Sequence, residues 1–324
     1  MQDIVFITPT STQPRYRKRI DSFLHQEKNI YVYSFKRKHQ IINDFGDKFN
    51  VEYLSEIEDG KYFSRIYKLI ISFLKLKQKV SNDVEIYIFG LDLAFFSILF
   101  LNYRKLTLEI GDIRKSKNVL INLLSTRIES FVFKNINELV VTSPGFMRYY
   151  VKKYPNLKIT IRLNKVYKDY LPYYKIKSDL KIKQKNTDKI TIGIIGLLRY
   201  KTVLKVLEQY INSEKFDFLI IGDGILVKEI KKIKANNIFY YSAFRNPDDL
   251  NVIYNSIDFN FVVYNSKDIN VQLALPNKLY ESIYFNIPII VSRNTFLWEE
   301  VKKQEIGISV DDSRDEIDFD FENR

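Results

Sequence analysis

The chain has 324 residues, of which 46% are hydrophobic, and this length suits two domains of about 150 residues with a core each. It has no cysteine, which excludes disulfides, cysteine nucleophiles and thiolate metal sites. Only His25 and His39 supply imidazole, so we expect no metal centre. The net charge of +12 lies in residues 1–170, with 29 Lys and Arg against 17 Asp and Glu, whereas residues 171–324 hold 22 of each kind. We therefore expect the two halves to meet different partners.

The N-terminus, MQDIVFITPT, lacks the basic and apolar regions of a signal peptide and predicts a first β-strand. The most apolar stretch covers residues 86–101, and it contains Asp92. A membrane span needs about 20 apolar residues, so this stretch predicts a buried strand, a turn at Gly90 and a core helix. We expect the chain not to cross a membrane.

Short apolar runs rich in β-branched and aromatic residues alternate with longer amphipathic segments along the chain. The predicted strands cover residues 4–8, 30–35, 84–89, 106–109, 139–142, 190–195, 216–221, 238–241, 259–263 and 287–291. The predicted helices include residues 62–79, 119–133, 203–211 and 226–235. This alternation is typical of parallel, doubly wound α/β sheets.

A polar, lysine-rich stretch at residues 167–189 predicts the connection between domains at 1–170 and 171–324. Two open sheets joined in this way are expected to present the carboxyl ends of their strands to a shared cleft. Ligands of such sheets bind at those ends.

The first candidate motif is ITIGIIGLLRYKT, residues 190–202, in which a strand runs into Gly196 and Arg199 and Lys201 precede a helix. Two cations beside a helix N-terminus favour a diphosphate, although an ordinary loop with surface cations fits the pattern equally well. In the second, FDFLIIGDG, Gly222 and Gly224 allow the backbone to approach a ligand closely, or they form a common strand-to-helix turn.

The third motif, LALPNKLYESIYFNIPIIVS, covers residues 273–292 and is the most informative. Pro276 and Asn277 mark a helix start, Lys278 and Glu281 fall in its first turns, and Pro288 is predicted to end the helix. A carboxylate at this place can bind two ribose hydroxyls, while Lys278 and the helix amides favour phosphate. The structural alternative is that Glu281 only complements the helix dipole.

Taken in this order, the three segments resemble the donor-binding domain of family 4 (group 1) glycosyltransferases, retaining enzymes with two Rossmann-like domains. GLLRYKT resembles the family's diphosphate loop, LIIGDG its strand-to-glycine turn, and PNKLYES the segment whose Glu binds ribose. LNVIYNSIDFNFVVY, with Tyr254 and Asp258, resembles the segment just upstream. The resemblance covers residues 190–292 well and the first half only weakly.

The resemblance implies the GT-B fold, with two Rossmann-like doubly wound domains facing a central cleft. It implies a retaining, metal-independent hexosyltransferase with no cofactor, because the nucleotide-diphospho-sugar is a substrate. The implied site residues are Arg199 and Lys201 as catalytic cations, with Gly196, Gly222, Gly224, Asn277, Lys278 and Glu281 on the donor.

In the first half, LTLEIGDIR and ELVVTSPGF resemble the central strands of the family's acceptor domain, which implies that Glu109 or Asp112 lies near the transferred sugar. One departure is Leu273, where many members carry a second Glu, and this keeps open a catalytically silent protein of the same fold. Another is the acidic end, DDSRDEIDFDFENR, where members usually continue into helices. We expect a trimmed or naturally shortened form.

The helix predicted within residues 61–79 carries apolar Phe63, Ile66, Tyr67, Ile70, Phe73 and Leu74 at helical spacing, with lysines around them that include Lys68 and Lys75. It is either a domain helix with a basic outer face or a helix that lies on an anionic membrane. The basic cluster that follows the first strand is predicted to hold an acceptor's diphosphate. Its members are Arg15, Arg17, Lys18 and Arg19.

The sequence thus predicts a glycosyltransferase that is cytoplasmic and peripheral on the inner face of the cell membrane. Its partners would be a nucleotide-sugar donor and a glycan or polyprenyl-diphosphate-linked acceptor, in the synthesis of a bacterial surface polysaccharide such as a capsule. Two alternatives stay open, a sugar-nucleotide epimerase of the same fold and a nucleic-acid-binding protein suited to the pI of 9.4. No nucleic-acid-binding module is recognisable, so no nucleic-acid partner is expected.

Overall fold

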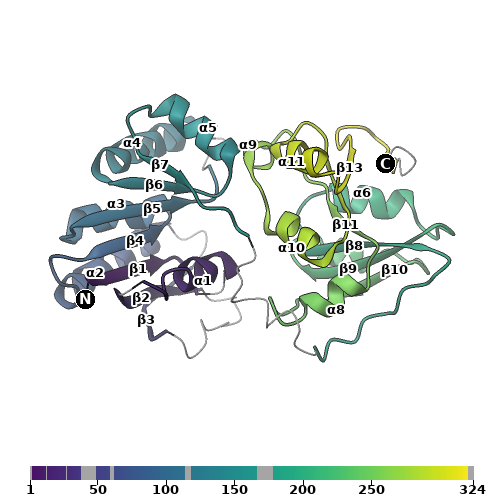
Figure 1. The fold of residues 1–324 in the computed structure, drawn as a ribbon, viewed down its shortest axis with the longest axis horizontal. Helices are drawn as coiled ribbons and strands as arrows, with labels where there is room; N and C mark the ends of the chain where they lie inside the picture. Colours follow the sequence, from purple (N-terminus) through teal and green to yellow (C-terminus); the bar gives the residue numbers. More distant parts are fainter. Residues whose placement is uncertain are drawn as a thin grey trace. The chain divides into compact units, whose positions relative to one another are not determined.

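The computed structural model describes residues 2–11, 13–26, 28–37, 49–58, 62–113, 118–165 and 178–319 (Figure 1). The chain divides into two compact units, Met1–Leu163 and Asn164–Arg324. Lys61, the first part of the predicted connection at 167–177, and the end of the chain at 320–324 lie outside the described residues.

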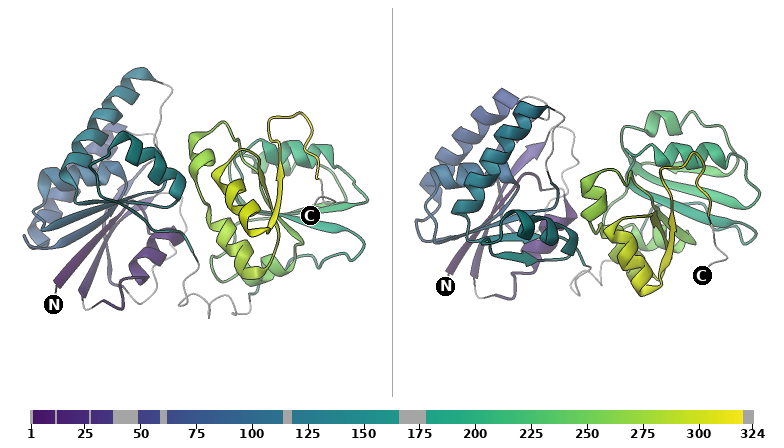
Figure 2. Two further views of the ribbon diagram at one scale, coloured as in Figure 1. Left: turned by 45° about the horizontal axis from the view of Figure 1, so that its top comes forward. Right: turned by 90° about the horizontal axis from the view of Figure 1, so that it is seen from above.

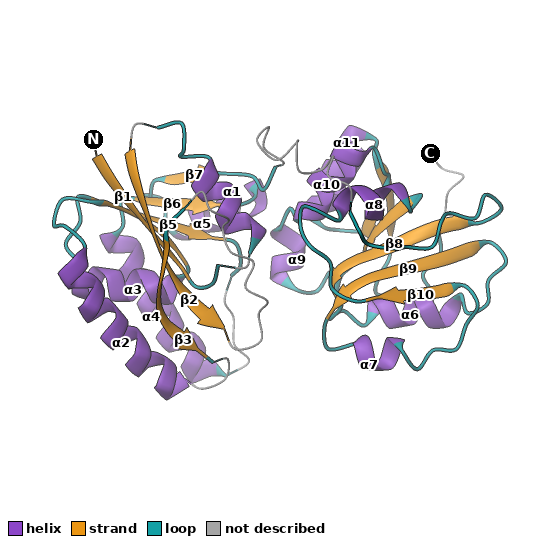
Figure 3. Cartoon of the chain, turned by 90° about the horizontal axis from the view of Figure 1, so that it is seen from below, coloured by secondary structure: helices purple, strands orange, loops and turns teal. Residues whose placement is uncertain are grey.

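Unit 1 is built on a sheet of seven parallel strands in the order β3-β2-β1-β4-β5-β6-β7. The strands are β1 (Gln2–Thr8), β2 (Lys28–Arg37), β3 (Val51–Ile57), β4 (Glu85–Phe89), β5 (Lys105–Ile110), β6 (Glu138–Val141) and β7 (Ile159–Ile161). The helices are α1 (Pro14–Asp21), α2 (Tyr62–Lys79), α3 (Leu91–Phe100), α4 (Val119–Asn135) and α5 (Pro144–Lys153). As Figures 2 and 3 show, α2, α3 and α4 form one layer against the sheet, and α1 covers the other face.

The predicted strand, turn and core helix at residues 86–101 are confirmed as β4, Gly90 and α3. Gly90 has a φ of 100°, which a residue with a side chain adopts only under strain, and its carbonyl accepts a hydrogen bond from the amide of Ala94. Among the described residues, no helix is both long enough and apolar enough to cross a bilayer.

Helix α2 has the predicted bounds, but its buried side differs from the predicted apolar face. Leu69, Phe73 and Leu76 are fully buried, whereas Ile66 and Tyr67 remain about half exposed or more, at 48% and 66%. Two of the predicted apolar positions thus face outward, because helical spacing alone does not say which of two adjacent stripes meets the sheet.

Unit 2 is built on six parallel strands in the order β10-β9-β8-β11-β12-β13. They are β8 (Ile190–Leu197), β9 (Phe216–Asp223), β10 (Ile238–Tyr241), β11 (Phe259–Val262), β12 (Ile289–Ser292) and β13 (Gly307–Val310). The helices are α6 (Thr202–Gln209), α7 (Val227–Ile230), α8 (Leu250–Asn255), α9 (Ile269–Leu273), α10 (Asn277–Phe285) and α11 (Phe296–Gln304). Separate apolar clusters cover the two faces of this sheet.

The predicted doubly wound α/β architecture is therefore confirmed, with several corrections in detail. Strands β3, β7 and β13 were not predicted, since the first carries two glutamates and the other two have only three and four residues. Helix α10 ends before Pro288, because Asn286 takes the left-handed conformation with a φ of 53°.

Residues 178–189, assigned to the connection, belong to the surface of unit 2. Leu180 and Ile182 pack against its core, and the Lys183 ammonium pairs with Asp217 at 2.8 Å. Two apolar residues separated by one position are thus enough to hold this segment on the surface of unit 2.

The strand order reverses once in each sheet, between β1 and β4 in unit 1 and between β8 and β11 in unit 2. In unit 2 the two strands pair only through Phe259 with Ile192 and Asn260 with Gly193, so their carboxyl halves are not hydrogen-bonded to each other. Open α/β sheets bind ligands at such reversals, beyond the carboxyl ends of the strands.

Candidate functional site

In unit 2, the predicted donor residues gather beyond the carboxyl end of β8. Gly196 has a φ of 108°, and a Cβ atom there would lie 3.5 Å from Cε of Lys278. The Lys278 ammonium also donates to Oε2 of Glu281 at 3.0 Å, one turn further along α10. Lys278 thus extends from the end of β8 to Glu281, and three predicted residues lie together.

Glu281 is almost completely buried, with 1% of its surface exposed, and several groups hold it in place. The Tyr254 hydroxyl donates to its Oε2 at 2.9 Å, and the Asn246 amide approaches its Oε1 at 3.4 Å. Burial and the Glu281 carboxylate raise the pKa of Tyr254 well above its ordinary value, so Tyr254 remains a donor. A carboxyl group that is fixed in this way, with a lysine beside it, can accept hydrogen bonds from a ligand's hydroxyl groups.

Asn277, at the first position of α10, has a buried Oδ1 atom with no hydrogen-bond partner among the described residues. Buried polar atoms are normally paired, and exceptions commonly mark places where a ligand or water completes the network. This atom is therefore a candidate acceptor for a donor-sugar nucleotide.

Two aromatic rings form the next part of the site. Tyr200 and Tyr264 stack with ring centroids 4.5 Å apart, and the Arg199 guanidinium lies over Tyr200 and donates to its hydroxyl at 2.7 Å. Burial raises the pKa of Tyr264. The charge of Arg199 lowers this pKa and that of Glu281 raises it. Arg199 and Lys201 are exposed, and Lys201 is the N-cap of α6. Both cations are therefore close to the free amides at the start of this helix, which also favour the binding of an anion.

Gly222 and Gly224 have a packing explanation within the unit. A Cβ atom on Gly222 would lie 1.9 Å from the Gly196 carbonyl oxygen, and one on Gly224 would lie 2.3 Å from that of Leu198. The backbone at these two glycines thus closely approaches the end of β8 and the residue after it, whereas the sequence predicted a close approach to a ligand. These glycines shape the loop, and their direct contact with a donor stays a prediction.

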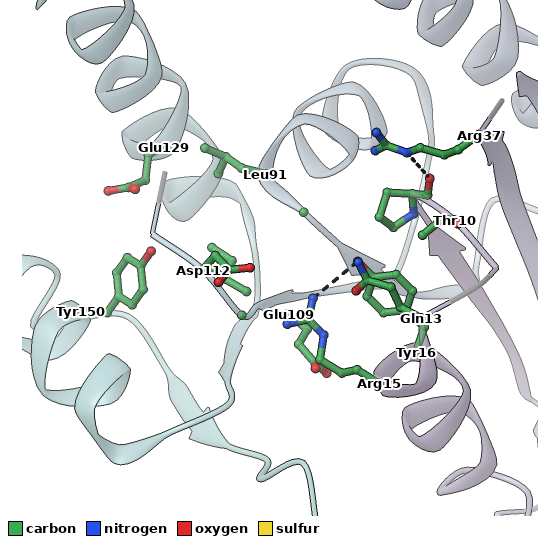
Figure 4. A pocket seen from close by; sticks show the side chains of 14 residues that line it. Thr10, Gln13, Arg15, Tyr16, Arg37, Leu91, Glu109, Asp112, Glu129 and Tyr150 are labelled. Atoms are coloured by element: carbon green, nitrogen blue, oxygen red, sulfur yellow. Dashed lines mark hydrogen bonds between the residues drawn. The ribbon is translucent and has the colours of Figure 1, made fainter. Parts of the chain in front are cut away.

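Unit 1 has a cavity of about 290 Å³ at its own strand reversal (Figure 4). Residues at or just after the carboxyl ends of β1, β4 and β5 line this cavity, together with residues of β2 and of four helices. The lining residues are Pro9, Thr10, Gln13, Arg15, Tyr16, Arg37, Gly90, Leu91, Glu109, Ile110, Gly111, Asp112, Glu129 and Tyr150. The predicted residues Arg15, Glu109 and Asp112 therefore share one cavity.

Arg15 is the main cation of this cavity. Its guanidinium lies against Gly111, where a Cβ atom would be 1.5 Å from Nη1, so a side chain there would displace the guanidinium. Burial lowers the pKa of Arg15, but Tyr16, Glu109 and Asp112 raise it overall, so the group stays charged. Its buried Nε has no hydrogen-bond partner among the described residues. A second cation, Arg37, lines the cavity and was missed because nothing in the sequence links the end of β2 to the other strands.

Glu109 is a buried hydrogen-bond acceptor in unit 1. It is 1% exposed and accepts hydrogen bonds from Nε of Arg19 and from the Tyr87 hydroxyl, both at 2.6 Å. Arg19 also donates to the Arg162 carbonyl at 2.9 Å, and its side chain is only 3% exposed. We therefore correct the prediction for Arg19: it is buried against Glu109, where an acceptor's diphosphate cannot reach it.

The remaining predicted cations of unit 1 lie apart from the cavity. Lys18 is buried, at 3% exposure, and Arg17 lies 4.0 Å from Asp21, one turn along α1. Lys68 and Lys75 are on α2, and the Lys68 ammonium donates to the Glu56 carbonyl at 2.7 Å. Of the basic cluster after β1, only Arg15 lines the cavity.

The fold and the two strand-end sites define a class of protein. Two parallel Rossmann-like sheets in one chain, with polar sites at their strand reversals, form the GT-B fold of glycosyltransferases, as the sequence predicted. Among the described residues, no cluster of His, Asp and Glu has the arrangement of a metal site.

Solved structures support this class. The chain is similar to sucrose-phosphate synthase from Thermosynechococcus elongatus, with a TM-score of 0.71 and 12% identity, over 97% of this chain and 87% of that one. It is also similar to the lipopolysaccharide outer core galactosyltransferase WaaB in its apo form (TM-score 0.62, 12% identity; 97% and 87% covered). A third is Anabaena HepE in complex with UDP (0.62, 11%; 97% and 87%). No family model matches the sequence, and no curated protein matches it significantly.

Proposed function

We propose that the protein is a glycosyltransferase that takes a sugar from a nucleotide-diphospho-sugar bound to unit 2. The observation that carries the proposal is the position of Lys278 between Gly196 and Glu281, at the strand reversal where such sheets bind ligands. The buried carboxylate suits the ribose hydroxyls, and the lysine suits the diphosphate. HepE, a similar structure, is in complex with UDP, which makes UDP the first nucleotide to test.

The proposed chemistry is the departure of a nucleoside diphosphate, which gains negative charge as the bond to the sugar breaks. Arg199 and Lys201 are exposed cations at the start of α6, and the helix amides add to their field. The Thr202 hydroxyl, buried and bonded to the Val263 carbonyl at 2.8 Å, ties this helix start to the end of β11. This arrangement supports the retaining, metal-independent reaction that the family resemblance implies.

The cavity of unit 1 is the proposed acceptor site. Arg15 and Arg37 line it together with the exposed carboxylate of Asp112, so it offers cations for a phosphate group and an acceptor for hydroxyl groups. This composition fits a glycan or a polyprenyl-diphosphate-linked acceptor. We place the reaction in the synthesis of a bacterial surface polysaccharide, on the inner face of the cell membrane.

A Glu281→Gln variant tests the donor site. We expect its affinity for UDP to fall by about 5- to 100-fold, because a charged hydrogen-bond partner contributes about 1–3 kcal/mol. Isothermal titration calorimetry measures the change, and circular dichroism confirms the fold. The matched control is Glu208→Gln, an exposed carboxylate on α6, which should leave the affinity unchanged. Equal affinity in both variants would remove Glu281 from the nucleotide site.

An Arg15→Met variant tests the acceptor site. With a phosphate-bearing acceptor, we expect kcat/KM to fall by about 10- to 100-fold, since a charge-assisted hydrogen bond contributes about 1.5–3 kcal/mol. UDP affinity should not change, because the donor residues are in unit 2. Arg17→Met is the control, on the same helix but away from the cavity. A loss of activity with Arg17→Met that equals the loss with Arg15→Met would contradict the assignment.

A further inference from the structure

The first two turns of α4 expose an unusual run of apolar side chains. Val119 and Leu120 are 79% and 75% exposed, Ile121 and Leu123 are 52% and 51% exposed, and Leu124 is 60% exposed. Exposed apolar residues on soluble proteins are usually scattered, whereas five in six consecutive positions form a contiguous patch. We call these five residues the α4 patch. Patches of this kind mark surfaces that bind another apolar surface.

The helix start that bears the patch is well formed. The Asn118 side chain accepts hydrogen bonds from the amides of Leu120 and Ile121, at 2.9 and 3.3 Å, and so caps the helix. The apolar side chains are therefore presented by a capped helix, which needs no refolding in order to bind.

The same helical layer carries further exposed apolar residues. Helix α3 packs against both α2 and α4, and α2 exposes Ile66, Tyr67 and Leu74 while α3 exposes Leu99. Figure 2 shows the three helices as one layer on the unit 1 sheet. Exposed apolar residues thus occur on all three helices of this layer.

The charge of this layer decides between two occupants. Helix α2 carries five cations and no carboxylate, namely Arg65, Lys68, Lys75, Lys77 and Lys79. Arg65 pairs with Asp92 of α3 and Lys79 pairs with Glu52 of β3, which leaves Lys68, Lys75 and Lys77 for the lipid phosphates. Helix α4 adds Arg127 and Lys134, and its one carboxylate, Glu129, accepts a hydrogen bond from Tyr154. A second copy that used the same face would bring these cations together, whereas an anionic bilayer complements them and lets the lysine stems lie along the lipid.

The position of the patch links it to the cavity of unit 1. The strands of a parallel sheet all end at the same edge of the sheet. Helices α2 and α4 are the next elements after β3 and β5, so both helices start on the side of that edge. The cavity lies at the same edge, and Glu129 of α4 lines it less than two turns beyond Leu124. A bilayer that contacts the patch would hold a lipid-linked acceptor close to the cavity.

We propose that the first two turns of α4 insert into the headgroup and upper acyl region of an anionic membrane, with Lys68, Lys75 and Lys77 of α2 on the lipid phosphates. This changes the predicted anchor from α2, whose buried side packs on unit 1, to α4. The inference rests on the proposed function only for the identity of the acceptor. The contact with lipid itself can be measured without any transfer reaction.

The test uses co-sedimentation of the full chain with vesicles of phosphatidylglycerol and phosphatidylcholine, and with vesicles of phosphatidylcholine alone. A Leu120→Ser, Leu124→Ser variant should bind the anionic vesicles at least about tenfold more weakly, because burying each leucine favours the lipid. The matched control is Val151→Ser, an exposed apolar residue of α5 at 43% exposure. High salt should weaken wild-type binding, and UDP affinity should be the same in all three proteins.

A second measurement detects insertion directly. Since the chain has no cysteine, Ile121→Cys and Val151→Cys each give one site for an environment-sensitive fluorophore. We expect a blue shift with anionic vesicles at position 121 and none at position 151. Vesicle binding that is equal in wild type and in the double variant would overturn the proposal. So would a wild-type dimer in solution that the double variant abolishes, because the occupant would then be a second copy. A wild-type protein that binds the anionic vesicles but does not bind UDP would instead contradict the proposed function.

Discussion

An Arg199→Ala, Lys201→Ala double variant is expected to reduce kcat by about 10²–10³-fold, the effect of removing charge stabilisation from a transition state. The negative charge on the departing diphosphate grows along the reaction, so these exposed cations contribute more to the transition state than to the ground state. Steady-state kinetics with a nucleotide-sugar donor measure the change. The nucleotide affinity should fall less than kcat.

The control for this pair is Lys228→Ala, Lys232→Ala, two exposed cations near α7 in the same unit. It removes the same net charge at positions outside the predicted donor-binding residues, so kcat should be retained. A normal kcat in the Arg199 and Lys201 variant would show that the diphosphate binds elsewhere.

An Arg19→Ala variant is expected to lower the free energy of unfolding of unit 1 by about 3–5 kcal/mol. The substitution leaves the Glu109 carboxylate buried and without the guanidinium that pairs with it at 2.6 Å, and the loss of one partner of a buried ion pair is strongly destabilising. Burial, with Glu109 next, raises the pKa of Tyr87, so its hydroxyl remains a donor but brings no positive charge. Urea unfolding followed by circular dichroism reports the loss.

Two controls separate this effect from general damage. Arg104→Ala removes a cation whose partner Glu85 is partly exposed, at 3.0 Å, and should change stability by less than about 1 kcal/mol. An Arg19→Met, Glu109→Leu double variant should recover much of the stability, since an apolar pair of similar volume replaces the ion pair. Full stability of Arg19→Ala would contradict the structural role given to this pair.

The grouping of Lys278 and Glu281 with Gly196 could be predicted from the sequence because these residues lie in short contiguous motifs. Asn277, Lys278 and Glu281 fall within five positions of one helix, so one motif brings them together. The turn at Gly196 is equally local. The stacking of Tyr200 on Tyr264 was not predictable, because it joins segments that only the sheet brings together.

The cavity of unit 1 was harder to predict for the same reason. Arg15 and Arg37 line it from separate segments of the chain, and no spacing relates them. A charge pattern also cannot show that Arg19 faces inward while Arg15 reaches the cavity, because both depend on how α1 packs. The exposure of the α4 patch was likewise hidden, since the same apolar run would suit a fully buried helix.

The central claim is that unit 2 binds the nucleotide of a sugar donor at the strand reversal between β8 and β11. Hydrogen–deuterium exchange of the wild-type chain, with and without UDP, tests it most directly. We predict that UDP slows exchange in peptides covering residues 195–202 and 275–282 and leaves unit 1 unchanged. Unchanged exchange throughout the chain with both UDP and GDP, or protection confined to unit 1, would contradict the account.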